Sequence, residues 1–491
     1  MSTITSSKGI ISTTNYLASE AAYEIINKSG NAIDAALAAS GVLSVTSQHQ
    51  CGLGGDLFAI VFKKGEIFAL NASGYSGSNI EHYSKETKTR EINTFKDKRL
   101  ITIPGAVDGW MKLHKKFGNK ELDVILDRSI KISKNGFKCD QSLLDAIEKT
   151  RDTFKENPLN NIKNINQIVK RPKISKQLKI IAKHGRTGFY EGIFGEEFIK
   201  FSEGIITAKD LKRNQAQWVK PISYNFFGEK FWTIPPNSQA ILILETLKKI
   251  NKKIKKIPKS IEDFQIKIIN EMISIGGNRD SYLSEFFNTR GHDTNYMCIV
   301  DRNGMGISLV QSNAHGFGSH CVLKKSGVFL HNRGLGFIKN DNKFYPKNKT
   351  KPPSTLCPLI ISKNKKISTL LGTMGADSQP QIILQNWINN IYKKDIFSSL
   401  SSPRWIIGGN YKKELFPFNT WKNDKKLLFF FYEKNFPKKI LKKLSRYKNL
   451  KLKKCIDNQN LFGHCQMIVK NNRKYSGYHD PRSITGSTIA L

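Results

Sequence analysis

The segment 295–311 constrains the fold more than any other part of the chain. Two strand-like runs, Asn295 to Val300 and Gly306 to Gln311, are joined by Asp301-Arg-Asn-Gly304. An Asn-Gly pair between two such runs is a strong signal for a β-hairpin, because both residues accept the positive φ angles that a tight turn requires. The chain is therefore expected to build an antiparallel sheet around this hairpin.

Further strands and helices are expected on both sides of the hairpin. Strand-like apolar runs lie at 57–62, 231–234, 327–331, 356–361 and 367–371. Helix signals lie at 16–27, 30–45, from Pro104 onward, within 140–200, at 239–249 and at 378–391, where Ser378 is the expected N-cap and Pro380 lies in the first turn. Strands framed by helices predict an α+β fold, a layered αββα sandwich rather than a barrel.

Length and composition are compatible with such a fold. The 491 residues match two to four domains or one large layered unit, and a hydrophobic content of 39% excludes a mostly disordered chain. No apolar run reaches the roughly 18 residues that span a bilayer. The longest candidate, Ala32 to Val45, is interrupted by Asp34, so we expect a buried helix there and no membrane partner.

The cysteines favour a reducing compartment. The seven cysteines are scattered and include no Cys-x-x-Cys pair, so neither a disulfide framework nor a zinc ribbon is expected. The first residues, MSTITSSKGIIS, lack the features of a secretory signal. We therefore expect a cytoplasmic protein.

The chain is strongly basic, with 79 Lys and Arg against 40 Asp and Glu and a formal net charge of +39. Only 15 of the cations are Arg, the residue that makes bidentate contacts to nucleic acids, and 64 are Lys. Lys, Asn and Ile share A/T-rich codons, so compositional drift explains their joint abundance. We expect no nucleic-acid partner. A catalytically inactive basic protein that binds polyanions stays open as an alternative.

Common cofactor and nucleophile motifs are missing. The sequence contains no Gly-x-x-x-x-Gly-Lys-Ser/Thr phosphate loop and no Gly-x-Ser-x-Gly elbow. His315, His320 and Cys321 lie close together, but they lack the spacing of a zinc site. No metal and no cofactor are expected.

Two segments point to acyl transfer when they are taken together. Asp293-Thr294 begins a strand, and cleavage between these two residues would expose a threonine whose own α-amine, with a pKa near ~8, is a base beside its hydroxyl. Leu371-Gly-Thr-Met-Gly-Ala-Asp377 is a strand that enters a glycine turn and then a helix, where backbone N–H groups can cradle an oxyanion. Each pattern is common by itself, but acyl transfer needs both a nucleophile and an oxyanion hole.

With these motifs the chain resembles the γ-glutamyltranspeptidase family of N-terminal-nucleophile (Ntn) hydrolases. The resemblance is carried by short motifs in the family's order: Gly30 to Ala39, Gly52 to Asp56, Pro104 to Gly109, Phe189 to Gly192, Gly204 to Leu211, Pro235 to Gln239, Asp293-Thr294, the glycine turn at 372–376, and Asp480 to Ser483. The resemblance implies self-cleavage into fragments 1–293 and 294–491, which stay together as a heterodimer with a single Ntn fold.

The resemblance also implies roles for individual residues. Thr294 would be the nucleophile, Ser312 the hydroxyl that bonds its amine, and Gly375 with Ala376 the oxyanion hole. Ser354 and Thr355 match paired hydroxyl residues that line the substrate site.

Three departures from the family pattern concern the grip on a γ-glutamyl group. The resemblance implies an arginine in the N-terminal half that binds the glutamyl group, but residues 1–89 contain no arginine. It also implies an acidic residue in the segment 334–337, which reads Gly-Leu-Gly-Phe. The asparagine expected near Ala314 is displaced, and Asn313 is the substrate-binding candidate beside it. Arg333 lies in the same loop, and its guanidinium fork is suited to a carboxylate.

The sequence therefore predicts an enzyme that transfers or hydrolyses the acyl group of a small amide, with a γ-glutamyl amide as the first substrate class. The motifs Asn332-Arg-Gly334, Gly372 to Gly375 and Gln379-Pro-Gln381 resemble the family branch that includes oxamate amidohydrolase. A strict hydrolase of a short amide such as oxamate is therefore the alternative within the family.

Overall fold

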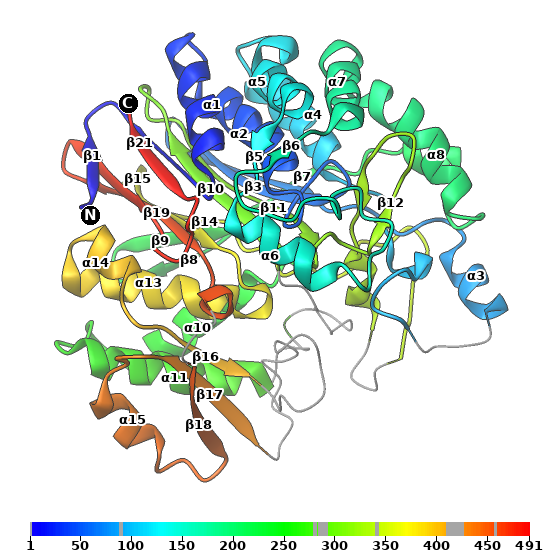
Figure 1. The fold of residues 1–491 in the computed structure, drawn as a ribbon. Helices are drawn as coiled ribbons and strands as arrows, with labels where there is room; N and C mark the ends of the chain where they lie inside the picture. Colours follow the sequence, from blue (N-terminus) through cyan, green and yellow to red (C-terminus); the bar gives the residue numbers. More distant parts are fainter. Residues whose placement is uncertain are drawn as a thin grey trace.

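The computed structural model describes residues 2–87, 92–277, 282, 293–338, 343–408, 427–455 and 459–491. Most strands belong to two seven-stranded sheets, in which every neighbouring pair is antiparallel (Figure 1). Sheet I has the order β21 (Ser487–Ala490), β2 (Ile10–Thr13), β10 (Asp293–Val300), β11 (Gly306–Ala314), β3 (Asp56–Lys63), β4 (Glu66–Ala72) and β7 (Gln217–Val219). Sheet II has the order β1 (Ile4–Ser6), β20 (Lys474–His479), β19 (Cys465–Asn471), β15 (Lys366–Thr373), β14 (Leu359–Lys363), β9 (Glu229–Thr233) and β8 (Ile222–Phe226).

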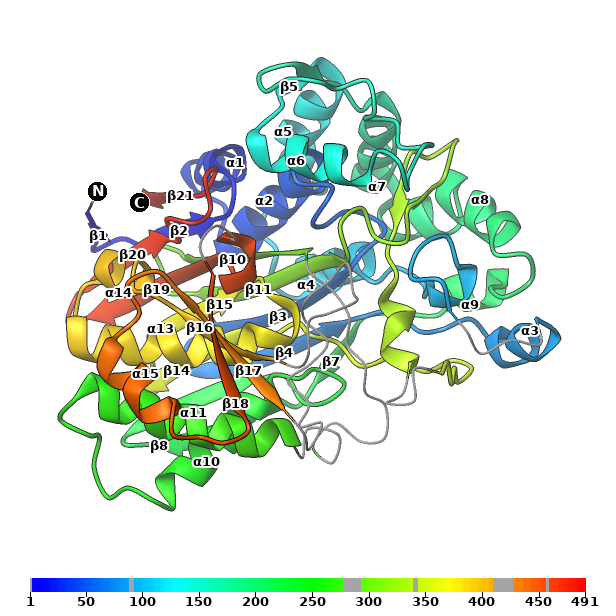
Figure 2. The same ribbon diagram turned by 60° about the horizontal axis from the view of Figure 1, so that its bottom comes forward.

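Different helices pack on the two sheets (Figure 2). Sheet I contacts α1 (Tyr16–Asn27), α2 (Ala32–Thr46) and α4 (Ala106–Phe117). Sheet II contacts α10 (Ile241–Asn251), α13 (Gln379–Lys393) and α14 (Ile396–Leu400). The other α-helices in the described ranges are α3 (Ile80–Glu86), α5 (Leu122–Asn135), α6 (Gln141–Thr150), α7 (Pro172–Tyr190), α8 (Ile193–Phe201), α9 (Ala208–Lys212), α11 (Ile261–Gly277) and α15 (Lys438–Leu444).

Smaller sheets lie beside these two. The strands β16 (Trp405–Gly408), β17 (Leu428–Glu433) and β18 (Leu450–Cys455) form one of them, and β17 and β18 are parallel. The pairs β12 (Cys321–Val322) with β13 (Phe329–Leu330), and β5 (Phe137–Lys138) with β6 (Ile168–Val169), form the others. In the described ranges no helix has the length and apolar sequence that crossing a bilayer requires, and none of the seven cysteines forms a disulfide.

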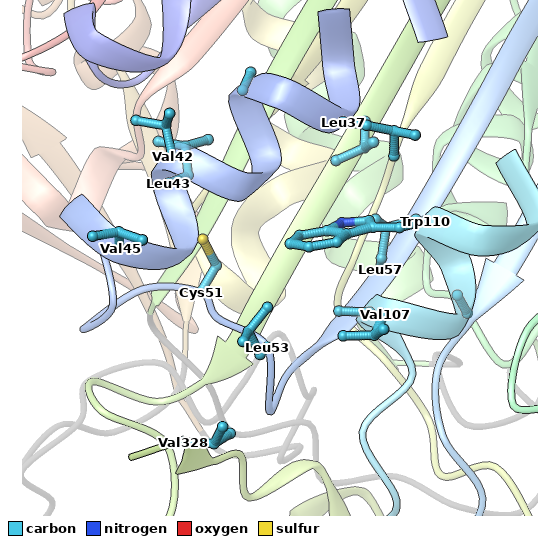
Figure 3. Close-up of a cluster of buried hydrophobic side chains, with 14 of the residues drawn as sticks. Leu37, Val42, Leu43, Val45, Cys51, Leu53, Leu57, Val107, Trp110 and Val328 are labelled. Atoms are coloured by element: carbon cyan, nitrogen blue, oxygen red, sulfur yellow. The ribbon is translucent and has the colours of Figure 1, made fainter. Parts of the chain in front are cut away.

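Strand alternation divides the core into separate apolar clusters. On β10, Met297 and Ile299 join a cluster with α1, α2 and α4, whereas Tyr296, Cys298 and Val300 face the opposite way. Figure 3 shows part of the first cluster, where apolar side chains of α2, β3 and α4 meet. The second face of β10 contributes to a cluster that also contains Ile360, Ile367 and Leu370 of sheet II. A further cluster joins sheet II to α10, α11 and α13.

The central hairpin is confirmed, and so is the expected mixture of helices and sheets. β10 and β11 pair from Asn295 opposite Gln311 to Val300 opposite Gly306. The helix predicted over 30–45 is α2, every residue of which is buried. Because its apolar residues surround the whole helix, α2 is enclosed on all sides.

Some local expectations were wrong. Ser378 precedes α13, but its side chain does not cap the helix, because its hydroxyl donates to the Gly375 carbonyl oxygen at 2.6 Å. Pro104 lies before the N-cap Gly105 of α4 and not in its first turn. The strand expected over 327–331 is only Phe329–Leu330.

Gly372 of β15 packs tightly against β10 of sheet I. A Cβ atom added to Gly372 would lie 2.3 Å from the ring of Tyr296. Tyr296 is fully buried and its hydroxyl bonds Ser308 at 2.9 Å, so the ring has no room to move away. Gly372→Ala should destabilise the protein by about 1–3 kcal/mol through overpacking, measured as a lower urea midpoint. An unchanged midpoint would show that the two sheets separate easily here.

Candidate active site

Thr294 lies at the start of β10 beside two polar residues on neighbouring strands of sheet I. Its hydroxyl donates to Ser312 Oγ of β11 at 3.1 Å, and Ser312 is opposite Asp56 of β3 in the register. Thr294 is 2% exposed, and the other two are fully buried. The register between Asp293 and Asn295 is irregular, so a β-bulge marks the position of Thr294.

Arg333 links Ser312 to Asp56. It begins the 3₁₀ helix η2 (Arg333–Phe337), its Nη2 donates to Ser312 Oγ at 3.4 Å, and its Nε lies 3.7 Å from Asp56 Oδ2. His331 Nδ1 lies 3.5 Å from the same carboxylate oxygen. Burial lowers the pKa of Arg333, and the carboxylates of Asp56 and Asp377 oppose that shift. A buried cation is thus held beside the threonine by carboxylates.

The glycine turn and the Ser354-Thr355 pair lie together at the C-terminal end of β15, the central strand of sheet II. One side-chain amide joins them, because Gln239 Nε2 donates to the carbonyl oxygens of Thr355 at 2.9 Å and Ala376 at 2.8 Å. Gly375 has a φ of +126°, which favours glycine. The backbone N–H groups of Gly375 and Ala376 have no hydrogen-bond acceptor in the described part of the chain.

The contacts between the sheets relate these two groups of residues. Tyr296, two positions after Thr294, contacts Gly372, three positions before Gly375. At the other end of the same strands, Ile367 approaches Gly306, the partner of Val300. The strands β10 and β15 therefore run in opposite directions across this contact. Because the strands are antiparallel, Thr294, which precedes Tyr296, and the glycine turn, which follows Gly372, lie at the same end of the two strands.

The 3₁₀ helix η2 provides a second connection. A Cβ atom on its Gly336 would lie 2.7 Å from the Pro353 carbonyl oxygen, so η2 packs directly on the segment that leads into Ser354. The hydroxyl of Ser354 is fully buried and has no hydrogen-bond partner among the described residues. A buried hydroxyl without a partner is a group that a ligand can satisfy.

Asn313 differs from the other predicted residues. It follows Ser312 on β11 and therefore points to the opposite face of sheet I. Its Nδ2 donates to the Gln48 carbonyl oxygen at 3.0 Å, on the side of the loop that follows α2. The structure does not bring the Asn313 side chain together with Thr294. Asp293 is the first residue of β10, and its side chain lies outside the described residues.

Three residues of the site were not found from the sequence. Asp56 and Gln239 were named only as the last residues of two family motifs, with no role of their own, and His331 was given none. Asp56 offered a signal, because it is an acidic residue directly before the apolar run Leu57 to Phe62, where a buried carboxylate needs a partner. No group of three or more His, Cys, Asp or Glu in the described ranges could hold a metal ion.

Comparison with known proteins assigns the chain to a family. The model of the gamma-glutamyltranspeptidase family matches residues 18–267 and 249–490. The chain belongs to the gamma-glutamyltranspeptidase family. The resemblance predicted from the short motifs is thus confirmed, and the protein is an enzyme related to hydrolases and transferases that act on amides.

Individual relatives in the gamma-glutamyltranspeptidase family are distant. A glutathione hydrolase-like proenzyme from Bacillus subtilis is 28% identical over 83% of this chain and 86% of its own length. The oxamate amidohydrolase proenzyme of Klebsiella pneumoniae is 25% identical over 82% of this chain and 86% of its own. Among solved structures, a cephalosporin acylase from Bacillus halodurans superposes with a TM-score of 0.84 at 25% identity, covering 100% of this chain and 97% of that one.

The Arg333–Asp56 contact predicts a large effect of removing the cation. Arg333→Met would leave the Asp56 carboxylate buried without its guanidinium, and breaking a buried pair on one side costs about 3–5 kcal/mol. We expect a correspondingly lower urea midpoint. The double variant Arg333→Met with Asp56→Asn should recover part of the loss, because it removes the unpaired charge. Equal losses in the single and double variants would contradict this account.

Proposed function

We propose that the protein is a self-processing Ntn amidohydrolase or acyltransferase in which Thr294 is the nucleophile. The observation that carries the proposal is the position of Thr294, buried at the start of β10 with its hydroxyl bonded to Ser312. Cleavage of the peptide bond between Asp293 and Thr294 makes Thr294 an N-terminal residue. Its α-amine then accepts the proton of its own hydroxyl, as N-terminal threonine nucleophiles require.

The proposed reaction uses the glycine turn as the oxyanion hole. Thr294 Oγ attacks the amide carbonyl, and the backbone N–H groups of Gly375 and Ala376 stabilise the oxyanion that forms. Two features support this role. These N–H groups have no other acceptor among the described residues, and the β10–β15 contact leads both strands to the same end of the two sheets.

The proposed fold is a four-layer αββα sandwich whose two fragments are interlocked. Fragment 294–491 supplies β10, β11 and β21 to sheet I, and fragment 1–293 supplies β2, β3, β4 and β7. Sheet II also draws strands from both fragments. Separation of the fragments would break three strand pairs in sheet I and two in sheet II, so the heterodimer stays associated after cleavage.

The proposed substrate is a small amide, with two candidate acyl groups. Similarity to a glutathione hydrolase-like proenzyme favours a γ-glutamyl group. Similarity to an oxamate amidohydrolase proenzyme, and the lack of an acidic residue in 334–337, favour a short carboxylate-bearing amide such as oxamate with Arg333 as its cationic partner. Ser354 and Thr355 would supply hydroxyl groups to either acyl group.

A direct comparison of substrates tests the proposal. Purified protein is incubated with a γ-glutamyl anilide and, separately, with oxamate, while release of the aniline and of ammonia is followed. We expect turnover of at least one, together with a small fragment whose first residue is Thr294. If the protein stays in one piece, hydrolyses neither amide and instead binds a phosphate-bearing resin in a salt-dependent way, the polyanion-binding alternative is correct.

A further inference from the structure

Lys351 lies three positions before Ser354, and its ammonium group is bound by oxygen atoms from a distant part of the chain. Its Nζ donates to the carbonyl oxygen of Ser73 at 2.5 Å and to that of Gln215. It also donates at 3.4 Å to the main-chain and side-chain oxygens of Asn71, at the end of β4. All these acceptors are uncharged. Lys351 therefore fastens the start of its segment to one end of sheet I.

Two prolines transmit the position of Lys351 to Ser354. Pro352 and Pro353 stand between them, both are buried, and each ring fixes its own φ at about −65°. The 3₁₀ helix η2 closes the other side, because a Cβ atom on Gly336 would lie 2.7 Å from the Pro353 carbonyl oxygen and 3.0 Å from the Pro352 side chain. A shift at Lys351 is therefore passed on to Ser354 and is not absorbed by the backbone between them.

Hydrogen bonds of Asn237 complete the link between this segment and β4. Asn71 Nδ2 donates to Asn237 Oδ1 at 2.7 Å, and Asn237 Nδ2 donates to the Pro352 carbonyl oxygen at 2.5 Å. The Asn237 carbonyl oxygen accepts the N–H of Ser354 at 2.8 Å. Asn71 thus binds the segment twice, once through Lys351 and once through Asn237. Loss of the first link would leave the segment held from one side.

The turn that Lys351 binds also holds Asp56. Gly74, the residue after Ser73, donates its N–H to Asp56 Oδ1 at 3.0 Å. The other carboxylate oxygen of Asp56 is the one that lies 3.7 Å from Arg333 Nε. One turn of sheet I therefore positions Arg333 through Asp56 and the hydroxyl pair at 354–355 through Lys351.

The surroundings of Lys351 bring its titration close to neutral pH. Burial lowers its pKa to about 7, the carboxylates of Asp56 on β3 and Asp108 on α4 oppose that shift, and the guanidinium of Arg213 adds to it. The ring of Tyr75 lies 4.7 Å from Nζ and also carries Arg213 at 3.8 Å. A neutral amine has lost one N–H donor and its charge, so it holds carbonyl oxygens less firmly than an ammonium does.

We propose that Lys351 is a positioning residue for acyl transfer: its ammonium holds Ser354 and Thr355 in place, and substrate binding weakens when the ammonium loses its proton. The inference rests on the proposed function, which gives these two hydroxyl groups to the acyl group of the substrate. Thr294 and the glycine turn lie on other segments and keep their positions. Deprotonation of Lys351 should therefore raise KM more than it lowers kcat.

The pH dependence of KM tests this inference. KM and kcat are measured at pH 6 and pH 8 with the amide, γ-glutamyl anilide or oxamate, that the enzyme turns over. We expect KM to rise about tenfold between these values, because the protonated fraction of a group that titrates near neutrality falls by this factor. Lys351→Met keeps a long side chain without the charge. Its KM should be high at both pH values, with a ratio near one.

The matched control is Lys349→Met. Lys349 is exposed two positions earlier, so this variant removes the same charge and should keep the tenfold ratio. A ratio near one in the unaltered enzyme, or an equal ratio in Lys351→Met, would overturn the inference. If Lys351→Met does not fold, the ratio in the unaltered enzyme decides alone. Self-cleavage before Thr294 with turnover would then leave the proposed function intact, whereas absence of both in the unaltered protein would overturn the two proposals together.

Discussion

Thr294→Ala should leave the chain in one piece and without amidase activity. In a denaturing gel the unaltered protein is expected to give two bands, which correspond to fragments 1–293 and 294–491, and the variant a single band. Alanine has no hydroxyl to attack the preceding peptide bond or the substrate carbonyl. Turnover should therefore fall to background, as it does when the nucleophile of a covalent mechanism is removed.

The control for this experiment is another buried threonine. Thr233 of β9 is fully buried, and its hydroxyl donates to the Pro358 carbonyl oxygen at 2.7 Å. Thr233→Ala should cost about 1 kcal/mol of stability for the lost hydrogen bond and still give two bands. Thr294→Ser keeps a hydroxyl and should also cleave. Two bands from Thr294→Ala would remove Thr294 from the mechanism.

Gly463→Ala should reduce kcat strongly and leave KM nearly unchanged. Gly463 packs directly under the glycine turn, because a Cβ atom there would lie 2.5 Å from the Met374 carbonyl oxygen and 2.7 Å from Thr373 Oγ1. The added methyl group would push the turn and misalign the N–H groups of Gly375 and Ala376. Loss of one oxyanion-hole donor costs about 100- to 1,000-fold in kcat, and we expect a loss near the lower end.

The push on the turn is expected because Gly463 cannot retreat. Arg404 is fully buried, and its Nη1 donates to the carbonyl oxygens of Phe462 at 2.8 Å and Gly463 at 2.9 Å. The Asp480 carboxylate holds Arg404 and also accepts the N–H of Cys465 at 2.8 Å. These hydrogen bonds keep the segment 462–465 from moving away from the glycine turn. The added methyl group therefore displaces the turn and not Gly463.

Gly228→Ala separates the clash from the backbone effect. Gly228 and Gly463 have similar positive φ angles, +82° and +71°, but a Cβ atom on Gly228 meets nothing within 4 Å. Both alanine variants should lose roughly 1 kcal/mol of stability from the left-handed conformation. Only Gly463→Ala should lose kcat. Equal kcat values for the two variants would show that the turn does not depend on Gly463.

The sequence alone was informative wherever a local signal set the structure. The Asn-Gly turn and the flanking runs located β10 and β11, and the Ala-rich apolar run 32–45, interrupted only by Asp34 and small polar residues, located a fully buried helix. The same local signals failed at helix ends, where the Ser378 hydroxyl donates to the Gly375 carbonyl oxygen and accepts no N–H of its own helix. A serine hydroxyl can accept from a helix N–H or donate to a nearby carbonyl oxygen, and only the folded chain decides which hydrogen bond forms.

The residues of the candidate site show the same division. Thr294, Arg333 and the glycine turn were predicted because each lies in a short motif, and Ser312 and Ser354 were predicted because the family resemblance implies them. Gln239, which bonds Thr355 and Ala376, and His331, which lies beside Asp56, were not, because nothing in their own segments indicates these partners. Their roles depend on contacts between residues more than 100 positions apart in the chain, and a local pattern does not record such contacts.

The sequence by itself determined the family, the antiparallel hairpin that carries Thr294, and the types of group that acyl transfer requires. Only the tertiary structure decided which groups meet: that Asp56 holds Arg333, that Asn313 points to the other face of sheet I, and that Gln239 joins Thr355 to Ala376. The physical reason is that strand alternation and turn chemistry act over a few residues, whereas ion pairs, buried amides and cavities form where distant segments pack.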